Sequence, residues 1–183
     1  MNGSCATLVV MELTKTERLI LYNQYAILEK LDPEQAEYCA QVREILSSGY
    51  VLEYYRFTQG VFDEFPAERS TTVRDIFDMY DMLGYAYKQL ADKTGIKASD
   101  ISFLGFSGNE ETEYMAYARF LKRIGLWASV DTSASDDLNS HIPMLPKYRI
   151  MLSRWNASTD RHQLTKDDIT RIVAPIDWKA AGV

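Results

Sequence analysis

The chain has 183 residues, of which 46% are apolar and 25% are charged, and its formal net charge is −6. This composition excludes a disordered chain, and the acidic charge argues against broad binding of nucleic acids. The sequence contains no apolar run of about 18 residues, which a membrane span requires, and its two cysteines have no disulfide or metal-site spacing. We therefore expect a soluble cytoplasmic protein, and the sequence indicates no cofactor and no metal.

The chain is predicted to consist of a short extension, one main domain and a tail. Residues 1–10 lack the basic start of a signal peptide, and Met11 is an alternative start, so these residues are interpreted as an N-terminal extension. Residues 11–175 are predicted to form a single helical domain. Residues 176–183 then form a C-terminal tail.

Hydrophobic periodicity predicts an all-α fold, a compact array of about seven helices. The first and last helices begin at capping boxes, Thr14 with Glu17 and Thr165 with Asp168. In a capping box, these two side chains satisfy free amides of the first helical turn. The helices are predicted over residues 14–31, 33–48, 50–57, 66–93, 108–124, 143–155 and 165–174. The aromatic residues of 50–57 also allow a strand, but the position of this segment between helices favours a short helix.

Two segments depart from the helical pattern. Residues 101–106, ISFLGF, are short and apolar and contain a glycine, which predicts a minor strand or a buried turn. Residues 129–141, SVDTSASDDLNSH, are small and polar, which predicts a loop.

Three carboxylates, Asp75, Asp78 and Asp81, are spaced three residues apart in the segment DIFDMYD. At about 100° per residue they lie on one side of the predicted helix, opposite its apolar residues. A metal site would need ligands from a second helix, often with a Glu-x-x-His motif, and the sequence contains no such motif. We interpret this acidic strip as a solvated face. An interface, a metal site and the centre of an enzyme are the alternatives.

Ser107 follows the predicted strand and precedes a helix, which is the setting of a nucleophile elbow. The motif G-x-S-x-G is incomplete here, because Asn109 replaces its second glycine. His141 follows in the chain order of a hydrolase, but the large parallel sheet of that fold is not predicted. Ser107 with Glu110 also matches a capping box, which explains the same residues. A hydrolase centred on Ser107 remains an alternative.

Basic and aromatic residues occur together in the last third of the chain. Arg119 and Arg123 lie near Trp127 at the end of one predicted helix, and a second mixture occurs within residues 147–155. Such mixtures bind single-stranded nucleic acids through phosphate contacts and base stacking. However, cations also favour helix C-termini, and tryptophan is usually buried. We interpret Arg119, Arg123 and Trp127 as a candidate partner surface, with a nucleic-acid-associated regulator as the alternative.

Six segments occur in a characteristic order between Met11 and Ala174. They are ELTKTERLILYNQYAILEKLDP, GYVLEYY, VRDIFDMYDML, ISFLGF, EYMAYARF and PMLPKYRIMLSRW. With these segments the chain resembles the YfbU family of bacterial proteins. The resemblance implies a cytosolic, multihelical protein, and it implies no catalytic residue. Some members carry a DNA-binding ribbon-helix-helix segment at the front, which residues 1–10 are too short to form.

These features predict a non-enzymatic interaction protein that works as a homo-oligomer, with a further protein partner as an additional expectation. Residues 1–64 carry 10 acidic and 5 basic residues, whereas residues 114–183 carry 7 acidic and 10 basic residues. This division is compatible with contacts between copies, and solvated charge explains it as well. Tyr54, Tyr55 and Tyr85 are predicted to be half-buried contact residues, because tyrosine combines an apolar ring with a polar end.

Overall fold

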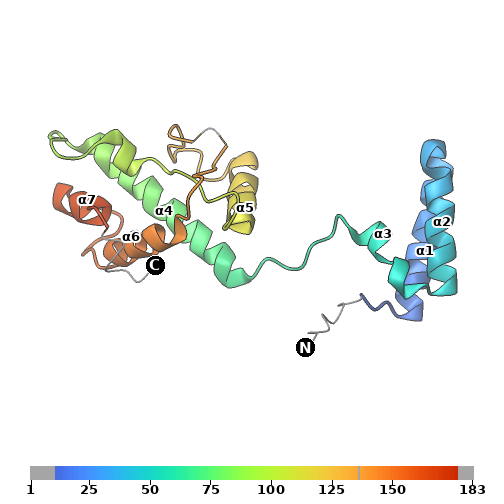
Figure 1. The fold of residues 1–183 in the computed structure, drawn as a ribbon. Coiled ribbons are helices and arrows are strands. Elements are labelled where there is room, and N and C mark those ends of the chain that lie inside the picture. The colour runs from blue at the N-terminus through green and yellow to red at the C-terminus, as the bar shows by residue number, and fades with distance from the viewer. Residues whose placement is uncertain (1–10, 136, 177–183) are drawn as a thin grey trace, which may run out of the picture. The chain divides into compact units, whose positions relative to one another are not determined.

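The computed structural model describes residues 11–135 and 137–176, and these residues form seven α-helices and no strand (Figure 1). The all-α prediction is therefore confirmed. The predicted extension, residues 1–10, and residues 177–183 of the predicted tail lie outside the described residues. The α-helices are α1 (Lys15–Leu31), α2 (Ala36–Ser48), α3 (Tyr55–Thr58), α4 (Ala67–Gln89), α5 (Thr112–Arg123), α6 (Leu145–Asn156) and α7 (Lys166–Val173). The short 3-10 helices are η1 (Pro33–Gln35), η2 (Val51–Glu53) and η3 (Ala98–Ile101).

Contacts between residues divide the chain into two units, each of which is described by itself. Unit 1 ends at Glu64 and contains α1, α2 and α3. Unit 2 begins at Phe65 and contains α4, α5, α6 and α7. The grouping of residues 11–175 into one domain stays a prediction.

Unit 1 is built on a hairpin of α1 and α2. The predicted capping box begins α1: the Glu17 amide donates to the Thr14 hydroxyl at 3.2 Å, and the Thr14 amide donates to the Glu17 carboxylate at 2.7 Å. Between the helices, the Asp32 carboxylate accepts the Glu34 amide at 3.2 Å. Gly49, at a φ of +70°, ends α2 in the left-handed conformation that glycine adopts without strain.

The interior of unit 1 is small. Its buried apolar side chains are Cys39, Val42, Ile45, Leu46 and Tyr54. None of them lies on α1, which polar groups connect to α2. The Arg18 guanidinium donates to the Leu46 carbonyl at 3.0 Å. Arg43 donates to the Tyr22 hydroxyl at 2.7 Å and forms an ion pair with Glu29.

The core of unit 2 forms around α4, which α5, α6 and α7 all contact. The buried residues of α4 are Val73, Ile76, Phe77, Met79, Tyr80, Leu83 and Ala86. The Phe77 and Tyr80 rings lie 5.0 and 5.5 Å from the ring of Phe103. Tyr80 also meets Tyr148 of α6 at 5.7 Å. Edge-on aromatic contacts of this kind connect α4 to α6 and to the chain before α5. None of the helices in the described residues is long and apolar enough to cross a lipid bilayer.

No strand forms at residues 101–106: Phe106 makes an isolated bridge to Asn139 in the loop at residues 129–141, and the Phe103 amide donates to the Asp131 carbonyl of that loop at 2.8 Å. In this bridge the Phe106 amide donates to the Leu138 carbonyl at 3.0 Å, and the Ser140 amide donates to the Phe106 carbonyl at 3.1 Å. The loop therefore lies directly against this apolar segment, and Leu138 is buried in the core.

Gly105 permits this close approach. Its φ is +88°, and a Cβ atom at this position would lie 2.0 Å from the Leu138 carbonyl oxygen. The Gly105 carbonyl also accepts the buried Tyr148 hydroxyl at 2.9 Å. A side chain at Gly105 would therefore displace the loop from the segment that carries this hydrogen bond.

We predict that Gly105→Ala destabilises the chain by more than about 3 kcal/mol, because the new methyl group has to displace the backbone of Leu138. Gly95→Ala is a matched control, since Gly95 has a φ of +87° but no atom within 4 Å of the place that a methyl group would take. The control should lose only about 1–2 kcal/mol of stability, which is the cost of placing an alanine in the left-handed conformation. Urea unfolding followed by circular dichroism measures both values, and equal losses would contradict the role of close contact.

Candidate functional site

The acidic strip of α4 holds a neighbouring segment of unit 2. Asp78 accepts the indole N–H of Trp127 at 2.6 Å, and Asp81 accepts the Ser129 hydroxyl. The carboxylates therefore do not converge on one point, and the described residues contain no cluster of three acidic, histidine or cysteine side chains suited to a metal ion. The strip is thus more than a solvated face, because two of its members fix the chain that follows α5.

Two open hollows flank the remaining carboxylate, Asp75. The smaller one has a volume of about 350 Å³ and is lined by Asp75, Asp78, Met82, Trp155, Arg161 and His162. The larger one has a volume of about 650 Å³ and is lined by Glu68, Thr72, Asp75, Arg149, Leu152, Ser153 and Asn156. Acidic groups of α4 and basic groups of α6 and the loop after it thus line the same surface. Within the described residues, neither hollow contains a hydrogen-bonded pair of an acid and a histidine.

Asp75 is the perturbed group between these hollows. Burial raises the pKa of its carboxyl above the ordinary 3.8, repulsion by Asp78 adds to this effect, and Arg161 opposes it. The Asp75 carboxylate forms no hydrogen bond or ion pair with the side chain or backbone of another described residue. Its charge is therefore less favourable in the folded chain than in water.

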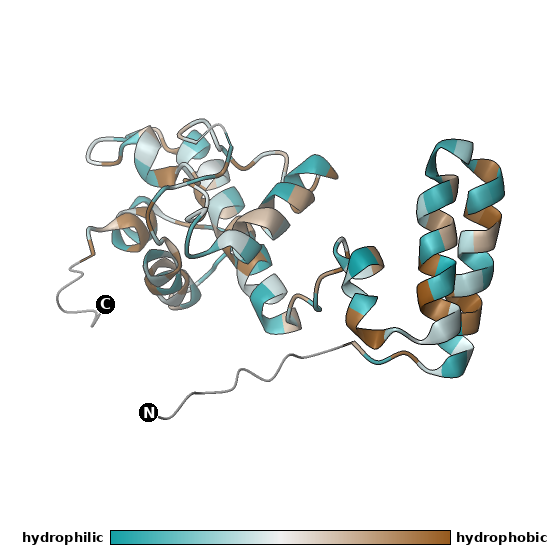
Figure 2. Cartoon of the chain, turned by 45° about the vertical axis from the view of Figure 1, so that its right-hand side comes forward, coloured by the Kyte–Doolittle hydropathy of each residue, from teal (hydrophilic) through white to brown (hydrophobic). Residues whose placement is uncertain are grey.

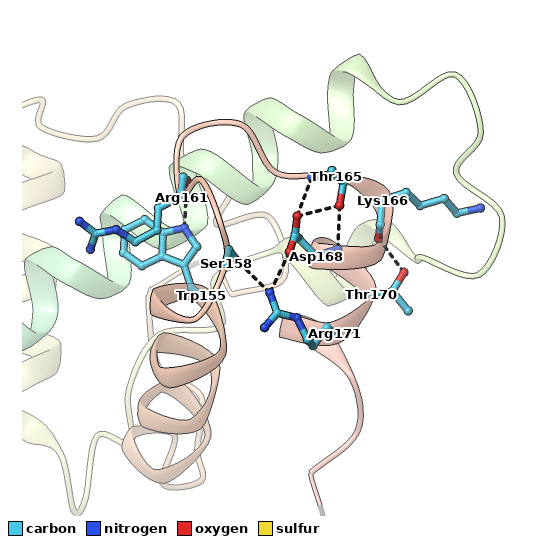
Figure 3. Close-up of polar contacts among 8 residues, drawn as sticks. All are labelled: Trp155, Ser158, Arg161, Thr165, Lys166, Asp168, Thr170 and Arg171. Carbon is cyan, nitrogen blue, oxygen red and sulfur yellow. Dashed lines mark hydrogen bonds and ion pairs between the residues drawn. The ribbon is translucent and has the colours of Figure 1, made fainter.

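One wall of the smaller hollow is held in place by contacts after α6 (Figure 3). The Trp155 indole donates to the Arg161 carbonyl at 3.1 Å, and the Arg161 guanidinium lies 5.1 Å from the centre of the indole. Arg161 also donates to the Asn156 side chain at 3.0 Å. This arginine is thus bound to its own loop, which limits its availability to a ligand.

The start of α7 adjoins this wall (Figure 3). The predicted capping box is present: the Asp168 amide donates to the Thr165 hydroxyl at 3.2 Å, and the Thr165 amide donates to the Asp168 carboxylate at 3.1 Å. The Thr165 hydroxyl also donates to this carboxylate and, with the Thr165 amide, lowers the pKa of Asp168. Arg171 connects the carboxylate at 2.8 Å to the Ser158 hydroxyl at 2.9 Å. These bonds join the loop after α6 to α7.

Ser107 is buried in a turn, and its hydroxyl is fully engaged there. The hydroxyl donates to the Glu110 carboxylate at 2.9 Å and accepts the amides of Asn109 and Glu110 at 3.3 Å. The turn therefore resembles half of the predicted capping box. His141 is exposed and is not among the hydrogen-bond partners of Ser107.

Glu111 is the buried polar residue that the sequence did not single out. Its carboxylate accepts the Ser107 amide at 2.9 Å and the Met144 amide at 2.9 and 3.0 Å. It also accepts the Leu145 amide at 2.7 Å, so one side chain binds the start of α6 and the turn before α5. The Ser107 amide bonds to Glu111 rather than to Glu110, and α5 begins at Thr112, four residues later than predicted.

Arg119 and Arg123 of the candidate partner surface lie at the exposed C-terminal end of α5. Arg119 binds the Asp137 carbonyl at 2.6 Å and the Asp137 carboxylate at 3.2 Å. The Arg123 guanidinium lies 5.7 Å from the ring centre of Phe120. The two arginines thus contact different groups.

Trp127, the third residue of that surface, is largely enclosed by α4. Its ring stacks on Phe77 at 5.5 Å, and the Arg74 guanidinium lies 5.1 Å from the ring centre. Lys122 donates to the Trp127 carbonyl at 2.9 Å, and burial lowers the pKa of this lysine. The partner role of Arg119, Arg123 and Trp127 stays a prediction.

The three candidate contact tyrosines lie in different environments. Tyr54 is buried against Phe57 in unit 1, at a ring-centre distance of 5.6 Å. Tyr55, the next residue in the chain, is exposed. Tyr85 is exposed on α4 of unit 2. Their role as partner contacts also stays a prediction.

Helix α1 carries an uncovered apolar surface. Ile20, Ile27 and Leu31 are 52%, 59% and 75% exposed, and Leu28 is exposed beside them. Figure 2 shows hydrophobic residues along this hairpin. We name Ile20, Ile27, Leu28 and Leu31 the outward stripe. The sequence could have indicated this stripe, because the apolar residues of α1 lie on more than one side of the helix. An ordinary amphipathic helix has a single apolar side.

The chain matches a protein-family model. Residues 11–174, which are most of the 183 residues, match the model of the YfbU domain. The match begins at Met11 and continues through both units to the end of α7. It covers the segments on which the sequence resemblance rests.

We predict that Asp75→Asn raises the melting temperature at pH 7 by about 1 °C, because the substitution removes a charge that the fold disfavours. A raised folded pKa means that ionisation of Asp75 costs stability as the pH rises through that pKa. The gain should therefore shrink as the pH falls through the raised pKa, and it should vanish at about pH 3, below the ordinary 3.8 of the unfolded chain. Calorimetry at both pH values tests this, and an equal gain at both would assign it to packing instead.

We predict that Glu111→Gln destabilises the chain by about 2–4 kcal/mol, because an amide replaces a buried charge that accepts three backbone amides. Glu110→Gln is the matched control: its carboxylate accepts only the Ser107 hydroxyl, and its residue is exposed. The control should lose less than about 1 kcal/mol. Urea unfolding compares the two, and a Glu111 variant as stable as the control would sink the capping role.

Proposed function

The chain belongs to the YfbU family, and we propose that it works by binding, as a non-enzymatic helical protein that assembles with copies of itself. The proposed setting is the cytoplasm of a bacterium. Two cysteines without disulfide spacing are in keeping with that compartment.

The distribution of exposed apolar side chains carries this proposal. Of the 18 large hydrophobic residues that are exposed in the described part of the chain, 13 lie in residues 11–64. This stretch buries only five apolar side chains of its own. A unit of this size with so small an interior gains little stability alone, and exposed apolar patches of this kind are typical of surfaces that bind other proteins.

The two alternative functions have weaker support. A hydrolase would need an accessible Ser107 hydroxyl, yet Ser107 is buried and its hydroxyl accepts the amides of Asn109 and Glu110 in the turn before α5. A nucleic-acid binder would need a continuous basic surface, whereas Arg119 is paired with Asp137 in a chain of net charge −6. Binding between copies therefore accounts for more of the observed surface than either alternative.

We predict that the full chain has a mass of at least twice 21.0 kDa in solution at micromolar concentrations. Light scattering coupled to size exclusion, over roughly 1–100 μM, measures this mass. Raising the salt to about 1 M is the control, since apolar association persists in salt whereas association through exposed charges weakens. A mass of 21.0 kDa at every concentration would contradict the proposal.

A further inference from the structure

We propose that the outward stripe of α1 packs against the same stripe of a second copy. This inference rests on the proposed self-assembly and names the surface that produces it. The partner is thus an identical helix, and the expected interface is isologous, with each copy contributing the same residues.

The geometry of α1 separates two opposite sides. At about 100° per residue, Ile20, Ile27 and Leu31 fall within roughly 40° of one another. The residues that contact α2, among them Arg18 and Tyr22, lie about half a turn away. The outward stripe therefore faces away from α2, so that the hairpin itself cannot cover it.

The contacts of α1 inside unit 1 make this orientation unusual. Toward α2, the helix places Arg18 on the Leu46 carbonyl, Glu29 on Arg43 and partly buried residues such as Leu21, while the four residues of the outward stripe remain exposed. Burying one aliphatic side chain of this size is worth about 1.5–3 kcal/mol. Pairing two outward stripes removes six such side chains from water, Ile20, Ile27 and Leu31 of each copy, with Leu28 at the margin of the contact.

The charge of α1 favours a second copy as the occupant. The helix carries three basic and two acidic residues, whereas the rest of residues 1–64 carries two basic and eight acidic residues. Two acidic copies repel each other through most of this unit, and α1 is the surface where that repulsion is least. The outward stripe itself contains no charged residue.

The pattern of the stripe also suits an identical helix. Ile20, Ile27 and Leu31 are seven and four residues apart, which is the spacing that packs side chains between two helices. Gln24 lies midway along the same side. Its amide both donates and accepts hydrogen bonds, so two copies of Gln24 can pair at the middle of the interface.

Charge insertion at equal exposure tests the pairing in the full chain. Ile27 on the stripe and Ile142 in unit 2 are both 59% exposed, so Ile27→Glu and Ile142→Glu are a matched pair. We expect Ile27→Glu to weaken self-association by at least about 100-fold, because it buries an unpaired carboxylate. Ile142→Glu should keep the wild-type mass, and circular dichroism checks that both variants remain helical.

Cross-linking decides the case even where Ile27→Glu fails to fold. With Cys5 replaced by Ser, Gln24→Cys should link two chains through a short bismaleimide, whereas Gln41→Cys on the exposed side of α2 should not. An assembled chain that does not link at Gln24→Cys overturns the α1 pairing but leaves the proposed function in place. The same holds if Ile27→Glu folds and keeps the wild-type mass. A wild-type chain that is monomeric throughout overturns both.

Discussion

The buried carboxylate of Glu111 is the interaction on which the arrangement of unit 2 depends. Helix α6 has no side-chain cap of its own, and Glu111 supplies acceptors for its first amides together with the negative charge that a helix N-terminus favours. The same carboxylate holds the Ser107 amide, so α6 is fixed to the chain before α5. The bond from Tyr148 to the Gly105 carbonyl then joins α6 to the adjacent segment a second time.

The two units differ in how completely they bury their hydrophobic residues. In unit 2, the apolar side of α4 is covered by three helices and by aromatic rings, and its acidic side holds Trp127 and Ser129. In unit 1, Arg18 and Glu29 of α1 contact α2 through polar groups, and the outward stripe of α1 is left exposed. This difference favours α1 as the binding surface. The polar hollows beside Asp75 are lined by charged residues, but the described residues there do not form a catalytic arrangement.

Local signals made the helices predictable. The pairs Thr14–Glu17 and Thr165–Asp168 form as expected, because each capping box is complete within four residues. Glu111 could not be found in this way, since its partners in α6 are 33 and 34 residues distant and two other glutamates lie beside it. The bonds of the acidic strip to the chain after α5 span a similar separation. The outward stripe was missed for another reason: helical spacing predicts that apolar residues are buried, but it does not say by which molecule.

The exposed aliphatic side chains of α1 also bear on the life of the chain in a cell. Surfaces of this kind are recognised by chaperones and proteases when nothing covers them. If a second copy covers the stripe, only chains that have not assembled expose it to chaperones and proteases. The surface that joins two copies would then also set how many of them persist.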